Sequence, residues 1–237
     1  MPSHKPASPH APPPGQPPKM NHLRLSPANA AILLCDIQER FSASPAHPIP
    51  PLPPLSCRSC TGPKIAHFDH LEHMAEKLLK AAAALHVPVL ATEQNPKALG
   101  PTVARLAQLV PPDKTFPKTQ FSMLVPELAA TLANPAPKHV ALVGIEAHIC
   151  VLQTALDLLA RGIHVHVLAD AVSSCNAPER ALAFQTIRAA GGTVSTTEAF
   201  IYRLLADASH PRAKDIFAIV KEYSEATRDA LSALGAA

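Results

Sequence analysis

Residues 140–162 constrain the fold more than any other part of the chain. They read VALVGIEAHICVLQTALDLLARG, an apolar run that turns at Gly144 and continues with helical spacing up to Gly162. Continuous rather than alternating hydrophobicity is typical of a strand that is covered on both faces, as in a parallel sheet. The stretch therefore predicts a strand–turn–helix unit that carries Cys150 in the first turn of its helix.

The same pattern of a strand followed by a helix recurs along the chain. We predict further strands at 30–36, 87–92, 163–168 and 193–195. We predict the other helices at 66–85, 101–109, 124–132, 178–190, 198–206 and 210–234. Such alternation implies right-handed crossovers and helices on both faces of the sheet. The expected fold class is α/β, a three-layer αβα sandwich around a mainly parallel, doubly wound sheet.

Proline divides the chain into a core and two excluded segments. It is dense before Pro27 and again between Pro45 and Pro63, and Pro-rich segments stay extended because they cannot pack. We therefore expect a disordered tail at 1–27, with Met20 as an alternative start. The folded domain should span 28–222 with an inserted Pro-rich loop at 43–64, and a helical extension should follow at 223–237.

Charge and cysteine content argue against several classes of protein. The net charge of +3 resides in the first 35 residues, which carry three basic residues and no acid, so the rest is neutral (+3 minus +3 gives 0). A neutral body argues against nucleic-acid binding. No apolar run reaches the ~18 residues of a membrane span. An odd number of cysteines without a secretory signal favours a cytoplasmic protein with reduced thiols.

Three residues from separate segments are candidates for chemistry. Cys150 would meet the positive end of a helix dipole, which favours thiolate, although a lone cysteine of this kind is more often a core residue. Asp36 ends a predicted strand, where ligands of parallel sheets gather; the alternative is a helix N-cap. Lys118 lies between Phe116 and Phe121, where apolar surroundings would lower its pKa; the alternative is a surface lysine.

A metal site and a nucleotide site are both disfavoured. Cys57 and Cys60 form a CxxC pair that raises the alternative of zinc, but one such pair is a weak signal without correctly spaced partners. Of the histidines that follow, His70 and His73 fall on the solvent face of the predicted helix. No GxGxxG follows the first strand and no Walker phosphate loop occurs. We predict no metal and no cofactor.

Three ordered motifs resemble the isochorismatase-like cysteine hydrolase superfamily. They are AAILLCDIQERF around Asp36, FPKTQFSML around Lys118 and VALVGIEAHIC around Cys150. TEQNPKALGPT and the GIEAHIC form of the turn add a closer likeness to the eukaryotic isochorismatase domain-containing proteins, especially their second type. The resemblance covers residues 28–42 and 65–222 and implies the isochorismatase-like hydrolase fold.

The resemblance also implies a mechanism. Asp36 would be the general base, Lys118 the electrostatic partner or acid, and Cys150 the nucleophile of a catalytic triad. A cis peptide bond between Ile145 and Glu146 would direct the backbone N–H groups of Glu146 and Cys150 into an oxyanion hole. The implied reaction is hydrolysis of an amide or related C–N bond through a thioester intermediate.

Departures from the family narrow this expectation. Thr92-Glu93-Gln94 stands where related nicotinamidases carry a metal-binding Asp-x-His, so no metal is carried over. Isochorismatases proper lack the cysteine, so isochorismate is not the expected substrate. From position alone, we expect the substrate pocket to include Gln38, Phe41, Glu93, Gln94 and Phe121. The expected partner is a small-molecule substrate, and the resemblance implies a homo-oligomer. The alternative is an inactive member that binds a partner through its Pro-rich segments.

Overall fold

The computed structural model describes residues 24–42, 65–133 and 136–235. Four segments lie outside the described residues: residues 1–23 of the tail predicted at 1–27, the loop 43–64 with Cys57 and Cys60, and residues 134–135 and 236–237. In the part that is described, no helix combines the length and the hydrophobicity needed to cross a membrane.

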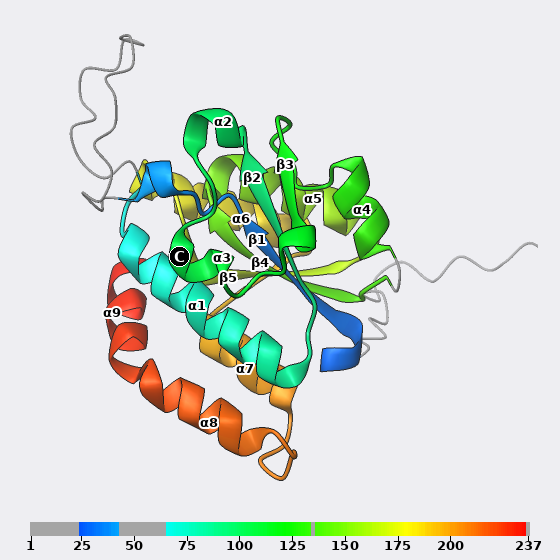
Figure 1. Ribbon diagram of the computed structural model, residues 1–237, viewed down its shortest axis with the longest axis vertical. Helices are drawn as coiled ribbons and strands as arrows, with labels where there is room; N and C mark the ends of the chain where they lie inside the picture. The colour runs from blue at the N-terminus through cyan, green and yellow to red at the C-terminus, as the bar shows by residue number, and fades with distance from the viewer. Residues whose placement is uncertain (1–23, 43–64, 134–135, 236–237) are drawn as a thin grey trace, which may run out of the picture.

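One six-stranded sheet organises the fold, with strand order β3-β2-β1-β4-β5-β6 (Figure 1). Every neighbouring pair is parallel. The strands are β1 Ala30–Cys35, β2 Val89–Gln94, β3 Thr115–Lys118, β4 His139–Ile145, β5 His164–Ser173 and β6 Thr193–Ser195. The predicted α/β class is therefore confirmed, with the chain winding outward from the central strands in both directions.

Helices cover both faces of this sheet, as Figure 1 shows. One face carries α1 Phe68–Leu85, α7 Thr197–Leu205, α8 Ala213–Glu222 and α9 Ser224–Leu234, and the other carries α4 Pro126–Leu132, α5 Leu152–Ala160 and α6 Ala177–Ala189. The short helices α2 Pro96–Leu99 and α3 Ala104–Ala107 lie in the connection from β2 to β3. Single turns occur at η1 Pro27–Asn29, η2 Glu39–Phe41, η3 Pro112–Lys114 and the π-helical η4 Ala147–Val151.

Strand β1 shows why its sequence is apolar throughout. All six of its residues are buried. Ile32 and Leu34 belong to the cluster under α1, whereas Leu33 and Cys35 belong to the cluster under α4 and α5. Because successive side chains of a strand point to opposite faces, a strand packed on both sides must be apolar at every position.

Several elements differ from the sequence prediction, among them β3 and the last helix. The edge strand β3 was not predicted, because four residues of mixed polarity that include Pro117 carry no strand periodicity. The helix expected at 210–234 is divided into α8 and α9 at Tyr223. The second of these packs on the core, since Ala230 and Leu234 are fully buried in it.

Gly144 lies within β4, directly opposite Cys35 of β1 and close to the carboxyl ends of both strands. Its φ is +119°, and an added Cβ would overlap the Cys35 carbonyl group. We expect Gly144→Ala to lower the free energy of unfolding by about 3 kcal/mol or more, as measured by urea denaturation. Gly162→Ala is the matched control: its φ of +75° is also left-handed, but nothing lies within 4 Å of the added atom. It should cost only about 1–2 kcal/mol, and equal losses would contradict this account.

Candidate active site

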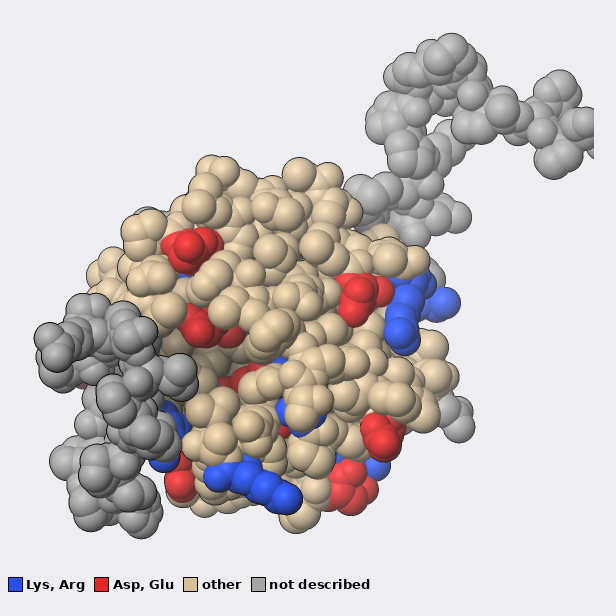
Figure 2. All heavy atoms as spheres, turned by 90° about the horizontal axis from the view of Figure 1, so that it is seen from above, with Lys and Arg blue, Asp and Glu red and all other residues tan. Residues whose placement is uncertain are grey.

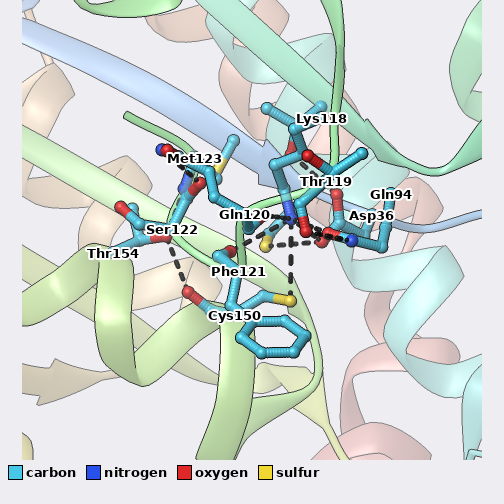
Figure 3. A network of polar contacts seen from close by, with 12 residues as sticks. Asp36, Gln94, Lys118, Thr119, Gln120, Phe121, Ser122, Met123, Cys150 and Thr154 are labelled. Carbon is cyan, nitrogen blue, oxygen red and sulfur yellow. Dashed lines mark hydrogen bonds and ion pairs between the residues drawn. The ribbon is translucent and has the colours of Figure 1, made fainter. Parts of the chain in front are cut away.

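The candidate site lies where the carboxyl ends of four strands meet. Asp36 directly follows β1, Gln94 ends β2, Lys118 ends β3 and Ile145 ends β4. Because the strands are parallel, their carboxyl ends all lie on the same side of the sheet. Residues that are distant in the sequence are thereby brought together, as the close-up in Figure 3 shows for Asp36, Gln94, Lys118 and Cys150.

A buried ion pair forms the centre of the site. The Lys118 Nζ lies 2.7 Å from Asp36 Oδ2, and the two side chains are 0% and 3% exposed. The other carboxylate oxygen, Oδ1, accepts a hydrogen bond of 2.8 Å from the Thr92 hydroxyl. The Asp36 backbone is left-handed, with φ at 52°, a conformation that is uncommon for residues other than glycine. The carboxylate is thus held by partners from two neighbouring strands.

Four further contacts fix the Lys118 ammonium. It donates to Gln94 Oε1 at 2.6 Å and to the backbone oxygens of Gln120 and Phe121 at 3.2 and 3.0 Å. It also lies 3.6 Å from the Cys150 sulfur. The interpretation of Lys118 as a surface lysine is therefore wrong, and the side chain points at both other members of the expected triad (Figure 3).

The prediction of a lowered pKa for Lys118 is also wrong. Burial favours the neutral amine, but the neighbouring Cys35 and the Asp36 carboxylate outweigh it, so that the pKa of Lys118 is raised above its usual value. A lysine in an apolar setting loses its proton only when no acid accompanies it into the interior. Lys118 is therefore a fixed cation, suited to stabilising negative charge rather than to accepting a proton.

Cys150 lies in the π-helical turn η4 rather than in a regular first turn of an α-helix. Its side chain is near the surface of the site, since the residue is 7% exposed. Thr154 anchors this turn to the segment after β3: its hydroxyl donates to the Cys150 carbonyl at 2.6 Å and accepts from the Met123 backbone at 2.9 Å. The preceding peptide bond between Ile145 and Glu146 is cis.

Cys35 is a member of the site that sequence reasoning missed. Its thiol is fully buried and donates to Asp36 Oδ2 at 3.5 Å. Burial, a hydrogen bond with Cys150 and the Asp36 charge raise the pKa of Cys35 well above its usual value. Its position next to Asp36 was the available signal. Alternation along a strand would place two successive side chains on opposite faces, but the left-handed backbone at Asp36 breaks that alternation.

The same three residues are the one group among the described residues whose ligand atoms could hold a metal. The sulfurs of Cys35 and Cys150 and an Asp36 oxygen lie within 4.8 Å of one another. However, the Lys118 ammonium already neutralises Asp36 and contacts Cys150. A metal ion would have to displace that ammonium or lie beside it, so the arrangement fits an ion pair better than a metal.

The five expected pocket residues divide into two groups. Gln94 and Phe121 lie at the site through their contacts with Lys118, and Phe121 is 51% exposed. Gln38 is fully buried, with its amide bonded to the backbone of Gln94 and Gly100. Glu93 accepts two hydrogen bonds from Thr102, and Phe41 packs against the core under α1. Gln38 and Glu93 therefore support the end of β2 and the loop after it, and Phe41 is part of the core packing.

A separate cavity of about 550 Å³ lies at the amino-terminal ends of the strands, where β4, β5 and β6 begin. Its lining includes Arg24, His139, His164, His166 and Arg203. None of the residues expected to be catalytic lines it, so its size does not make it the candidate active site.

Comparison with known proteins agrees with this geometry. A family model described as the isochorismatase domain matches residues 30–199. The chain is 39% identical over 198 residues to isochorismatase domain-containing protein 1 of Danio rerio, a match that covers 83% of this chain and 62% of that protein. It thus spans less than two thirds of that relative's length. The chain is also 39% identical to isochorismatase domain-containing protein 2 of Bos taurus, covering 85% of this chain and 87% of the relative.

A solved structure shows the same fold. The structure of MAR1 ribonuclease from Caenorhabditis elegans is 37% identical, with a TM-score of 0.72, and the match covers 84% of this chain and 92% of that chain. The residues that the family model matches, 30–199, include Asp36, Lys118 and Cys150.

Proposed function

The chain belongs to the isochorismatase family, and from this premise we propose that it is a metal-independent cysteine hydrolase that cleaves an amide or related C–N bond of a small molecule. One observation carries the proposal. Asp36, Lys118 and Cys150 converge in a single site, with the Lys118 ammonium 2.7 Å from the carboxylate and 3.6 Å from the sulfur. An acid, a cation and a thiol arranged in this way are the groups that nucleophilic acyl transfer needs.

We assign each group a role in two half-reactions. Asp36 takes the proton of the Cys150 thiol, and the sulfur attacks the substrate carbonyl. The backbone N–H groups of Glu146 and Cys150 hold the resulting oxyanion. Asp36 then returns the proton to the leaving nitrogen, and a thioester remains on Cys150. Water, deprotonated by Asp36, hydrolyses the thioester and regenerates the thiol. Lys118 stays charged throughout and stabilises the thiolate.

The substrate would enter beside Gln94 and Phe121, the two predicted pocket residues that contact Lys118 through side chain or backbone. A homo-oligomeric state and a cytoplasmic location stay predictions that rest on the family and on the thiol content.

A second candidate activity comes from the nematode relative, which is named a ribonuclease. The charge distribution favours a small molecule instead. On the face seen in Figure 2, acidic and basic side chains lie in small separate groups rather than in a basic tract, and RNA-binding surfaces concentrate basic charge. RNA oligonucleotides nevertheless belong in any panel of substrates tested.

Iodoacetamide labelling at pH 7 tests the reactive thiol directly. We expect Cys150 to be alkylated at least about tenfold faster than Cys175 and faster than free glutathione, because the Lys118 ammonium lies 3.6 Å from its sulfur and can stabilise negative charge there during attack. Peptide mapping by mass spectrometry gives both protein rates in one sample. Cys175 is an exposed residue, but partial desolvation of its thiol and the neighbouring Glu146 raise its pKa to about 11. Glutathione is therefore the stricter comparison, and a Cys150 rate at or below that of glutathione would count against the proposal.

A further inference from the structure

Cys35 is a buried thiol to which the hydrolytic mechanism gives no role. It is fully buried, whereas Cys150 beside it is 7% exposed. The two sulfurs and an Asp36 oxygen lie within 4.8 Å of one another. Two thiols at this distance, one slightly exposed and one fully enclosed, are arranged as the attacking and resolving cysteines of a thiol oxidation reaction.

We propose that this site has a second reaction, in which Cys150 reduces a hydroperoxide and Cys35 resolves the product into a Cys35–Cys150 disulfide. The proposal shares one premise with the proposed function, namely that Cys150 is the reactive thiol. It does not require that the protein hydrolyse any amide.

The first step consumes the peroxide at Cys150. The thiolate sulfur attacks the terminal oxygen of the hydroperoxide, an S–O bond forms and the O–O bond breaks. The departing alkoxide, or hydroxide when the oxidant is hydrogen peroxide, takes a proton from solvent. Cys150 becomes a sulfenic acid, and the two electrons that it loses reduce the peroxide. Lys118, at 3.6 Å from the sulfur, stabilises the thiolate that starts this step.

The second step uses the contact between Cys35 and Asp36. The Cys35 thiol donates to Asp36 Oδ2 at 3.5 Å, so the carboxylate can take its proton as the sulfur attacks. Cys35 then bonds to the Cys150 sulfur, the S–O bond breaks, and the hydroxyl leaves as water with the proton from Asp36. A small-molecule dithiol reduces the disulfide and restores both thiols.

Burial and charge assign the order of the two cysteines. Burial, the contact with Cys150 and the charge of Asp36 raise the pKa of Cys35, which keeps it a neutral thiol until Cys150 has been oxidised. Disulfide formation requires the two sulfurs, which lie within 4.8 Å of one another, to approach to ~2 Å. The disulfide removes the nucleophile, so hydrolysis stops until the site is reduced.

The test maps disulfides after oxidation of the folded protein. Cys57 and Cys60 form a CxxC pair that could oxidise by itself, so the experiment uses a background with Cys57→Ser and Cys60→Ser. The protein is treated with a small excess of hydrogen peroxide, the remaining thiols are blocked with a maleimide, and peptides are mapped by mass spectrometry. We expect one linked peptide pair that contains Cys35 and Cys150, with the mass of two hydrogens lost, and complete reversal by dithiothreitol.

Two variants make the result specific. Cys35→Ser should form no such link, and Cys150 should instead proceed to the sulfinic acid, with two oxygens added. Cys175→Ser should behave like the background protein. Thermal unfolding shows whether Cys35→Ser is folded; if it is not, the linked peptide in the background protein decides the question alone.

The outcomes separate this proposal from the hydrolase proposal. If Cys150 is alkylated rapidly but ends as sulfinic acid or links to Cys175, the disulfide proposal is overturned and the hydrolase proposal stands. If the Cys35–Cys150 link forms but no amide is cleaved, the disulfide proposal stands and the hydrolase proposal falls.

Discussion

Lys118→Met is expected to lower the free energy of unfolding by about 3–5 kcal/mol, the usual cost of leaving one charge of a buried ion pair without its partner. The substitution keeps much of the volume of the side chain but removes the cation that lies 2.7 Å from Asp36 and 3.6 Å from Cys150. Turnover should be lost as well, since the Cys150 thiolate loses its neighbouring charge. Urea denaturation measures the loss of stability, and the alkylation rate of Cys150 measures the loss of thiol reactivity on which turnover depends.

The double variant Lys118→Met/Asp36→Asn is the matched control for stability. It removes both charges, so no buried charge is left unpaired, and it should be more stable than the sum of the two single losses predicts. A strictly additive double variant would show that the ion pair does not couple the two residues. Cys150 should stay poorly reactive in both the single and the double variant.

In the wild-type protein, alkaline pH should reproduce part of the stability loss that is expected of Lys118→Met. The pKa of Lys118 is raised in the folded state, so folding favours its protonated form. The resulting contribution to stability is fully present below the usual lysine pKa of about 10.4 and disappears as pH rises through the higher folded-state value. The wild type should therefore lose stability above about pH 10 more steeply than Lys118→Met does.

Much of the fold and the triad could be predicted from sequence because both depend on local patterns. The unbroken apolar run of β1 marks a strand packed on both faces, and strand order then brings Asp36 and Cys150 to one edge of the sheet. The environment of each group could not be predicted, because it depends on partners from other strands. Lys118 among apolar residues suggested a lowered pKa, whereas Asp36, on a different strand, reverses the direction.

Backbone conformation and side-chain hydrogen bonding account for further differences between the prediction and the structure. Asp36 adopts a left-handed conformation, which aspartate tolerates better than most residues but which strand periodicity does not predict; the Asp36 carboxylate thereby comes within 3.5 Å of the Cys35 thiol. Likewise, AHICV reads as the start of an α-helix but forms a π-helical turn. Gln38 and Glu93 are polar residues near the ends of strands, as pocket residues often are, yet their hydrogen bonds go to the end of β2 and to the loop after it.

The most direct test of a nucleophilic role for Cys150 is turnover in an unbiased mixture of small molecules. Wild-type protein and Cys150→Ala are incubated separately with a metabolite extract, supplemented with an amide panel and RNA oligonucleotides, and depletion is followed by mass spectrometry. Cys175→Ala serves as the control for loss of an exposed thiol. For any compound that the wild type hydrolyses, we expect Cys150→Ala to reduce the rate by about 10⁴-fold or more and Cys175→Ala to leave it unchanged. A compound hydrolysed equally well by the wild type and by Cys150→Ala would contradict the assignment.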